Sequence, residues 1–521
     1  MLRISNIKIS VRESDQDSSI KSHLYKIFNQ SIENYTILKK SIDARYGSEK
    51  HFKGVYYVYE VTVNIGNEDK YLKYNNISKY IEETYKLPVL NKTIDKRPIV
   101  IGFGPAGLFC SYLLAKVGLK PIVFERGKPI DERIKDVEEF WNNNKLNPNS
   151  NIQFGEGGAG TFSDGKLNTN VKGQLRQKFV LETFVECGAP EEILYVNKPH
   201  IGTDLLRTVI KNMRNKIIAL GGEIKYSSTL TDIKYENNKV KSIIINDKDE
   251  YETDNLVLAI GHSARDTFKI LNNYLKMEPK PFAIGIRVQH KQYMINKNQY
   301  FLDNRFLPNA DYKLTYQTKD GRGVYSFCMC PGGFVVNSSS EENRLCINGM
   351  SNYNRNEENA NSAIVVTVSP NDYGNNIFDG MKFQQELENK AFIEGKGLIP
   401  VSLYKDYKKG QISTSFGEIK PIFKGGYNFA NINNIFPDYI NNSLKEGIDY
   451  FNTKINGFNN DDTIIAAVEA RTSSPVRILR DDNLESNIKG IYPCGEGAGY
   501  AGGITSAAID GIKVAEKIIN N

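Results

Sequence analysis

Cysteine, histidine and tryptophan are scarce in this sequence, which has six, five and one of them among 521 residues. So few cysteines do not make a disulfide framework, and we therefore expect a reducing compartment. The cysteines and histidines are also scattered, without the close spacing of zinc or iron–sulfur ligands, so no metal site is predicted.

A strong excess of one charge is missing as well. Lysine and arginine number 67 and aspartate and glutamate 61, which leaves a net charge of +6 with no long basic run. A nucleic-acid partner is therefore not expected. Hydrophobic residues make up 40% and charged residues 25% of the chain. This balance is typical of globular proteins, and the length predicts two to four domains.

The sequence also lacks an apolar run suited to a membrane. The most apolar stretch, residues 99–124, contains four glycines and two prolines together with Lys116 and Lys120, which argues against a membrane span. The first residues, MLRISNIKISVRESD, lack the pattern of a secretory signal. We expect a soluble cytoplasmic protein with no membrane partner.

Residues 1–95 form the first predicted domain. Apolar alternation and helical periodicity predict the order strand, helix, strand, strand, helix, with the closing helix over residues 76–87. This order is typical of a ferredoxin-like α+β module.

The remaining chain predicts two interleaved domains. Residues 96–267 and 464–521 read as one discontinuous α/β domain of the Rossmann type, because strands alternate with glycine turns and helices. Residues 268–463 are rich in Asn, Tyr and Gly and contain several strand-like runs. We interpret them as an inserted, mixed α+β substrate or cap domain.

A dinucleotide fingerprint opens the second domain. Gly102, Gly104 and Gly107 give G-x-G-x-x-G between the strand PIVIG and a helix that begins near Pro105 and Ala106. The same spacing recurs from Gly155 and from Gly497, but only the first copy has the full strand–turn–helix–strand context. The first glycine permits the tight turn, the second lets a pyrophosphate approach the backbone, and the third lets helix and strand pack closely. The N–H groups of the helix N-terminus face the phosphates.

Glu125 stands at the end of the next strand, 23 residues after Gly102. A carboxylate there accepts hydrogen bonds from ribose hydroxyls and disfavours a 2′-phosphate, so the expected nucleotide is an unphosphorylated adenosine.

Two later segments distinguish FAD from NAD. Residues 256–264, LVLAIGHSA, read as a buried strand that ends in a small-residue turn with Ile260, Gly261 and His262. Residues 490–518 read as a strand, a turn with Gly495 and Glu496, and a helix that starts near Gly502, Gly503 and Ile504. An acid in that turn can bind a ribityl hydroxyl, and the helix N-terminus can stabilise a reduced isoalloxazine.

The ordered pieces G-x-G-P-A-G, E-R, A-x-G and C-G-E-G resemble the FAD-binding fold of the glutathione-reductase and p-hydroxybenzoate-hydroxylase superfamily. The superfamily usually has Asp in the last turn, where this chain has Glu496. The resemblance implies non-covalent FAD. It also implies that the glycine-rich loop GEGGAGTFSDGK, with Gly158, Thr161 and Asp164, lies near the pyrophosphate and flavin. In the same way it places Arg126, Arg133 and Leu230 near adenosine or pyrophosphate.

Nearly the whole chain resembles bacterial proteins known as NAD(FAD)-utilising dehydrogenases, a group of uncharacterised flavoproteins. The matching runs include SIDAR, NIQFGEGGAGTFSDGKLNT, GHSARDTF, MCPGG, NGMSNYNR, NANSAIVV and EARTSSPVRILRD. The resemblance implies the fold more firmly than the reaction, because one fold hosts many chemistries.

Four residues are weaker candidates for substrate binding. Arg287, Arg471 and Arg477 suit an anion, although arginines that tie two domains together are an equal alternative. Cys330 precedes Pro331-Gly332-Gly333 and is a candidate to face the flavin, with buried packing as its alternative. Cys328 and Cys330 are expected on one face of a strand, which does not favour a redox disulfide.

The sequence predicts an FAD-dependent oxidoreductase that transfers a hydride to or from a small-molecule substrate. An anionic substrate is a candidate, and NAD(P)H is an open candidate for the transient electron donor. A disulfide-reductase architecture is not expected, because no second complete dinucleotide-binding domain is found. Three alternatives stay open: a flavoenzyme acting on tRNA or another macromolecule, a flavin monooxygenase, and a non-enzymatic flavin-binding redox sensor. No catalytic acid or base and no oligomeric state is predicted.

Overall fold

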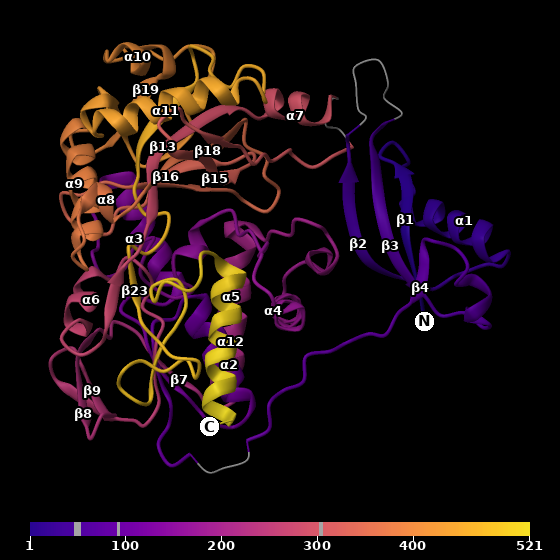
Figure 1. Ribbon diagram of the computed structural model, residues 1–521, viewed down its shortest axis with the longest axis horizontal. Coiled ribbons are helices and arrows are strands. Elements are labelled where there is room, and N and C mark those ends of the chain that lie inside the picture. The colour runs from indigo at the N-terminus through magenta and orange to yellow at the C-terminus, as the bar shows by residue number, and fades with distance from the viewer. Residues whose placement is uncertain (46–53, 91–93, 302–305, 521) are drawn as a thin grey trace.

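A computed structural model describes residues 1–45, 54–90, 94–301 and 306–520. A small N-terminal module stands to one side of a larger body (Figure 1). Within the described residues, none of the helices combines the length and the apolar character needed to cross a membrane.

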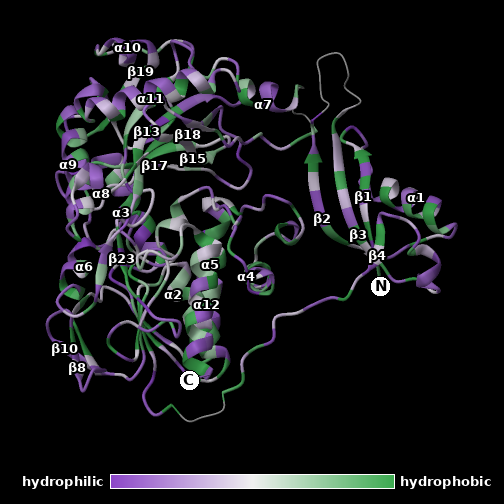
Figure 2. Cartoon of the chain, viewed as in Figure 1, coloured by the Kyte–Doolittle hydropathy of each residue, from purple (hydrophilic) through white to green (hydrophobic). Residues whose placement is uncertain are grey.

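The N-terminal module is an antiparallel sheet with the strand order β2-β3-β1-β4, covered by one helix. Buried and exposed residues alternate along β1, and Figure 2 shows polar and apolar positions mixed along these strands. Ile20, Leu24 and Phe28 are the buried residues of α1 and share one apolar cluster with the sheet. The elements are β1 (Leu2–Ser10), α1 (Gln16–Phe28), β2 (Thr36–Asp43), β3 (Tyr56–Val63), the 3-10 turn η2 (Glu68–Tyr71) and β4 (Ile77–Lys79).

The closing helix predicted over residues 76–87 is wrong. Residues 77–79 form β4, which pairs with Leu2–Ile4 of β1, and no helix follows it before residue 90. Instead, Tyr85 packs on Phe179 with ring centroids 4.6 Å apart and donates a hydrogen bond to Glu516. Contacts with the larger body therefore override the helical periodicity of this segment.

A five-stranded parallel sheet forms the centre of the second domain, with the order β24-β11-β5-β6-β7. The helices α2, α5 and α12 share one apolar core, and α2 and α12 run together in Figure 1. The strands are β5 (Ile99–Ile101), β6 (Ile122–Phe124), β7 (Glu223–Lys225), β11 (Leu256–Leu258) and β24 (Ile491–Pro493). The helices are α2 (Pro105–Lys116), α3 (Ile130–Asn143), α4 (Gln174–Glu186), α5 (Gly202–Ala219) and α12 (Ile504–Asn520), with the 3-10 turns η3 (Ala159–Phe162) and η4 (Glu191–Leu194).

Smaller elements flank the parallel sheet. Three antiparallel strands follow β7, and α6 comes directly after the turn that ends β11. Two short strands pair across the boundary with the next domain. These elements are β8 (Leu230–Glu236), β9 (Lys239–Ile245), β10 (Asp249–Glu252), α6 (Arg265–Leu271), β12 (Met277–Pro279) and β23 (Val476–Ile478).

The central domain is built on a seven-stranded sheet with the order β14-β15-β18-β13-β22-β19-β21. Its strands are β13 (Phe282–Lys291), β14 (Thr315–Gln317), β15 (Gly323–Cys330), β18 (Asn359–Val368), β19 (Ile399–Leu403), β21 (Tyr427–Phe429) and β22 (Ile464–Glu469). A second sheet contains β16 (Phe334–Asn337), β17 (Ile347–Met350) and β20 (Phe423–Lys424). The helices are α7 (Gln292–Tyr300), α8 (Pro370–Tyr373), α9 (Asp379–Glu394), α10 (Tyr404–Lys409) and α11 (Asp438–Phe451), with the 3-10 turn η5 (Ile432–Asn434).

The predicted boundary at residue 464 falls one strand too early. β22 begins at Ile464 and pairs with β13 and β19 of the seven-stranded sheet, so it belongs to the central domain. The chain returns to the parallel-sheet domain only after Glu469. The isolated sequence of a fully buried strand does not indicate which sheet it joins.

Candidate functional site

The glycine turn at the start of α2 has the geometry that the fingerprint predicts. Gly102 has a φ of +94°, and a Cβ atom there would lie 2.3 Å from the carbonyl oxygen of Ala259. Gly104 is the N-cap residue of α2, Pro105 is at the first helical turn, and no side chain caps the helix. The first-turn N–H groups of α2 are therefore oriented toward a ligand rather than toward a capping side chain.

The glycine-rich loop of residues 155–166 packs directly on this turn. Gly157 donates its N–H to the carbonyl of Phe103 at 2.8 Å. Gly158 has a φ of +64°, and a Cβ atom there would lie 2.9 Å from the Cα of Gly104. Two glycines thus face each other at the N-terminus of α2, and neither places a side chain there.

Glu125 connects the two loops. The carboxylate accepts backbone hydrogen bonds from Phe103 at 2.8 Å, from Gly127 at 2.9 Å and from Gly155 at 3.0 Å. The side chain is 5% exposed. A carboxylate has about four acceptor positions, so three backbone donors leave room for a further donor.

Arg133 binds the backbone of the glycine-rich loop and of the residues just before it. Its guanidinium is fully buried and donates to the carbonyls of Asn151, Ile152, Glu156 and Gly158 at 2.6 to 3.0 Å. Burial lowers the pKa of Arg133 to about 9. The structure therefore places this predicted cofactor residue behind the loop, where it fixes the loop backbone.

Arg126 and Leu230 lie at the same end of the parallel sheet. Arg126 donates to Asp266 at 2.9 Å and to Thr267 at 2.8 Å, and its guanidinium lies over the ring of Phe154. Leu230 is buried at the start of β8.

A second open region lies at the start of α12. Glu496, in the turn after β24, has a carboxylate oxygen 3.3 Å from Nδ1 of His262, in the turn after β11. Cβ atoms built on Gly261 and Gly502 would meet no atom within 4 Å, and one on Gly503 would meet only Ser506 at 4.0 Å. Packing within the described protein therefore does not explain why residues 502 and 503 are glycines.

The two regions are neighbours. A Cβ atom on Gly160 would lie 2.9 Å from the side chain of Ile504, the first residue of α12. Thr505 donates its hydroxyl to the carbonyl of Leu167 at 2.9 Å. Gly495 donates its N–H to Asp510 on α12 at 2.8 Å. The loop of residues 155–167 thus bridges the N-termini of α2 and α12.

Thr161 and Asp164, the other predicted residues of this loop, make internal contacts. Thr161 is buried and its carbonyl accepts from Thr203 at 2.7 Å. Asp164 binds the guanidinium of Arg355 at 2.6 and 2.9 Å and also binds Lys166. Lys166 and Arg355 are functional candidates that sequence reasoning missed, although both stand in the quoted runs TFSDGK and NYNR.

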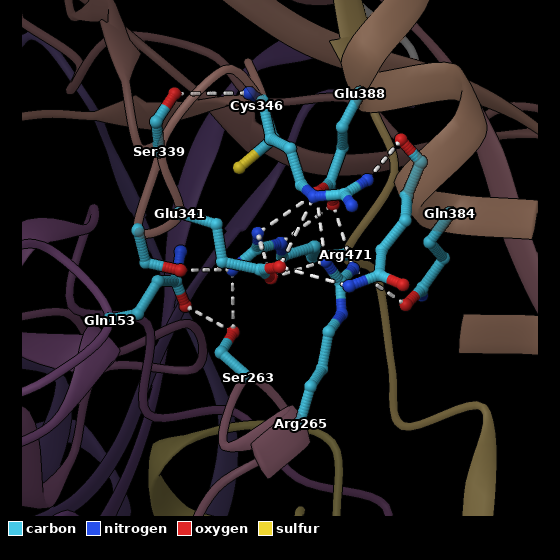
Figure 3. A network of polar contacts seen from close by, with 12 residues as sticks. Gln153, Ser263, Arg265, Ser339, Glu341, Cys346, Gln384, Glu388 and Arg471 are labelled. Atoms are coloured by element: carbon cyan, nitrogen blue, oxygen red, sulfur yellow. Dashed lines mark hydrogen bonds and ion pairs between the residues drawn. The ribbon is translucent and has the colours of Figure 1, made fainter. Parts of the chain in front are cut away.

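The three arginines that were weaker candidates for substrate binding are each paired with an acidic side chain. Arg287 is wholly buried and pairs with Glu469 at 3.0 Å. Arg471 pairs with Glu388 and belongs to the buried polar network of Figure 3, which joins Arg265 and Ser263 to the central domain. Arg477 is 38% exposed and pairs with Glu278 at 3.2 Å. In the described structure, Arg287 and Arg471 therefore hold parts of the protein together.

The two cysteines of C-x-C do not share a strand face as predicted. β15 contains an irregularity between Phe327 and Cys330, and Cys328 has a φ of +43°. Cys328 is exposed, whereas Cys330 is buried. A bulge turns successive side chains away from simple alternation, and nothing in the local sequence indicates it.

Comparison with known proteins connects this geometry to a family. Residues 281–472, which span β13 to the end of β22, match the family described as "FAD-dependent protein, C-terminal domain-like". Residues 1–64 match a domain of unknown function. An uncharacterized protein of Clostridium beijerinckii is 47% identical over 532 aligned residues, which cover 99% of this chain and 98% of that protein. This chain belongs to the same family.

Similarity to solved structures is distant. The flavin-dependent brominase Bmp2 is 14% identical, with 82% of this chain and 80% of that chain covered and a TM-score of 0.36. A glycerol-3-phosphate dehydrogenase from Bacillus halodurans, solved with FAD, is 9% identical, with 83% and 64% covered and a TM-score of 0.34.

FAD is the cofactor of this FAD-dependent family, which confirms the prediction from the glycine fingerprint. The residues present fit the group. Nε2 of His262 is buried and has no hydrogen-bond partner among the described residues, and the residue directly follows the open position at Gly261. The facing glycines at the α2 N-terminus, which an added Cβ would crowd, suit a pyrophosphate.

Proposed function

We propose that this protein is an oxidoreductase that transfers a hydride between a small substrate and non-covalently bound FAD. One observation carries the proposal: the loop of residues 155–167 brings two helix N-termini together, and glycines stand at each of them, Gly104 and Gly158 at α2 and Gly502 and Gly503 at α12. A dinucleotide with a flavin at one end needs two such positions, one for the pyrophosphate and one for the isoalloxazine.

We assign the candidate residues to the successive parts of the FAD molecule. The N–H groups at Gly104 to Gly107 of α2 bind the pyrophosphate, Glu125 accepts from the ribose hydroxyls, and Arg126 and Leu230 border the adenosine. Glu496 binds the ribityl chain beside His262. Gly158 keeps the α2 N-terminus clear of side chains, while Arg133 holds the loop in place.

The bound flavin supplies hydride transfer, and the residues around it supply orientation and electrostatics. The first turn of α12 is directed at the open region next to Gly502 and Gly503. Its partial positive charge favours the anionic form of a reduced isoalloxazine. Lys166 donates to the carbonyl of Met329 on β15, and this contact links the loop of residues 155–167 to the central domain.

The test is anaerobic rapid mixing of the purified yellow protein with NADH and, separately, with NADPH. Bleaching of the flavin absorbance by either nucleotide identifies the electron donor and supports the proposal. If neither nucleotide reduces the flavin, organic donors that carry a carboxylate are tested next. A protein that binds no FAD, or whose flavin no donor reduces, contradicts the proposed function.

A further inference from the structure

Two cations share one carboxylate beside the proposed flavin position. Asp164 is 3% exposed and binds both Lys166 and Arg355. Among the described residues, no other carboxylate lies within ion-pair distance of either cation. The cluster therefore holds two positive charges and one negative charge.

The neighbouring titratable groups do not supply the missing negative charge. Burial raises the pKa of the Cys330 thiol, and the pKa of the Cys328 thiol is also above its ordinary value, so both thiols are neutral at pH 7. Burial and the nearby Arg355 lower the pKa of His200, which is then neutral as well. Arg287 is balanced by its own partner Glu469. One positive charge remains without a counter-charge.

Unused donors accompany this charge. Lys166 has three N–H groups, of which one binds Asp164 and one binds the carbonyl of Met329. Arg355 uses Nε and Nη2 on Asp164, and its Nη1 has no partner among the described residues. The Lys166 side chain is 32% exposed and that of Arg355 is 12% exposed, so both remain accessible to a ligand.

The backbone holds both cations firmly in place. Residue 166 forms a bridge with His200, and His200 Nε2 lies 2.9 Å from the carbonyl of Tyr353. The backbone N–H of Tyr353 in turn donates a hydrogen bond to the carboxylate of Asp204 at 2.8 Å. Lys166 directly precedes Leu167, whose carbonyl contacts Thr505 in the first turn of α12. The backbone next to the cluster therefore contacts the first turn of α12.

We propose that Lys166 and Arg355 bind the carboxylate of an organic substrate and hold it beside the flavin. The net charge of the cluster favours a carboxylate over a phosphate. One carboxylate neutralises the single surplus positive charge, whereas a phosphate dianion would leave a net negative charge. A carboxylate also accepts one hydrogen bond from each unused donor. The position beside the flavin rests on the proposed function, but the binding of an anion at this cluster does not.

Cys328 provides a reporter for this site. It is the exposed cysteine among six, the other five being buried, and the positive charges of Lys166 and Arg287 act on its thiol. Alkylation by anionic iodoacetate and by neutral iodoacetamide forms the same carbon–sulfur bond and releases iodide. Both reagents react with the same thiolate, so the thiolate fraction drops out of the ratio of the two rates. The ratio then depends on the charge near the thiol, because only iodoacetate is charged.

We expect Lys166→Met to lower the iodoacetate-to-iodoacetamide ratio by at least about threefold, the effect of removing one unit charge nearby. Arg355→Met should lower the ratio less, because Arg355 acts on the neighbouring Cys330 and not directly on the Cys328 thiol. Asp164→Asn should raise the ratio. A general disruption of the site would not lower the ratio when a cation is removed and raise it when the carboxylate is removed. Lys172→Met, at an exposed position six residues along the same loop, is the matched control and should leave the ratio unchanged.

Protection identifies the class of anion. Benzoate and acetate should slow the iodoacetamide reaction of the wild-type protein but not of Lys166→Met, while phosphate and sulfate should protect less. Stronger protection by phosphate would overturn the carboxylate class. Equal ratios in Lys166→Met, Arg355→Met and Lys172→Met would overturn the site itself. FAD content, read from the visible spectrum of each sample, separates this failure from a failure of the proposed function.

Discussion

Arg471 binds both carboxylate oxygens of Glu388, at 2.8 and 3.0 Å, and Arg265 binds the same two oxygens at 2.8 Å. Glu388 is wholly buried on α9 of the central domain, whereas Arg265 begins α6 of the parallel-sheet domain (Figure 3). Burial alone would raise the pKa of Glu388, but the two arginines outweigh it and hold the pKa well below its usual range. One carboxylate thus joins the two domains.

Glu388→Gln should destabilise the protein strongly. The amide keeps the shape but removes the charge, and two buried arginines lose the buried carboxylate that binds both of them, a loss of about 3–5 kcal/mol. The measurement is the midpoint temperature of thermal unfolding. The control is Glu341→Gln, which contacts the same arginines from a position 28% exposed and should change the midpoint much less. Equal effects of the two substitutions would contradict a central role for Glu388.

Gly104→Val should yield a folded protein without FAD. Gly158 lies 3.6 Å from the position of an added Cβ at residue 104, so the branched valine would fill the space between the two loops and block the pyrophosphate. The check is the ratio of visible to protein absorbance after purification. Gly66→Val, at a position where an added Cβ meets no atom within 4 Å, is the control and should stay yellow. A yellow Gly104→Val protein with normal FAD content would refute the placement.

Local sequence patterns predicted the secondary structure around the two glycine turns of the candidate site. The strand, turn and helix around Gly102 follow from glycine spacing and apolar periodicity within 30 or so residues, and the structure has β5, α2 and β6 there. The start of α12 after the Gly-rich turn follows from the same kind of signal. The backbone conformation of these elements is determined by residues close to them in the sequence.

Contacts between distant segments were not predictable in this way. Asp164 and Arg355 are 191 residues apart, and no local period indicates that their loops meet. The bulge at Cys328 and the absence of a helix after β4 have the same origin, because pairing with neighbouring strands and packing on the larger body decide both. Arg287 and Arg471 looked like anion binders for the same reason: their buried acidic partners are distant in the sequence.

Glu125→Ala should weaken FAD binding by about 1–3 kcal/mol, or roughly 5- to 150-fold in Kd, as expected for lost hydrogen bonds to a buried charged group. The substitution also frees the N–H groups of Phe103 and Gly155, which loosens both loops around the cofactor. Flavin fluorescence during titration of the apoprotein with FAD gives the Kd. Unchanged affinity would show that the ribose binds elsewhere.

His290 should make the protein less stable at acidic pH. The ring is buried on β13, its Nε2 lies 2.8 Å from the carbonyl oxygen of Phe458, and burial lowers its pKa from 6.5 to about 4. Between these values the unfolded chain binds a proton that the folded protein does not. The stabilisation is therefore complete above pH 6.5 and is lost as the pH falls toward 4, by about 3 kcal/mol in total.

The test of this pH dependence compares thermal midpoints of the wild-type protein and His290→Gln from pH 8 to pH 4.5. Glutamine can still donate to the Phe458 carbonyl but does not titrate, so its midpoint should fall less between pH 6.5 and pH 4.5. Above pH 7 the histidine is neutral in both the folded and the unfolded chain, and the two curves should run parallel there. Parallel curves over the whole range would mean that His290 has the same pKa in the folded and the unfolded chain, and they would contradict the prediction.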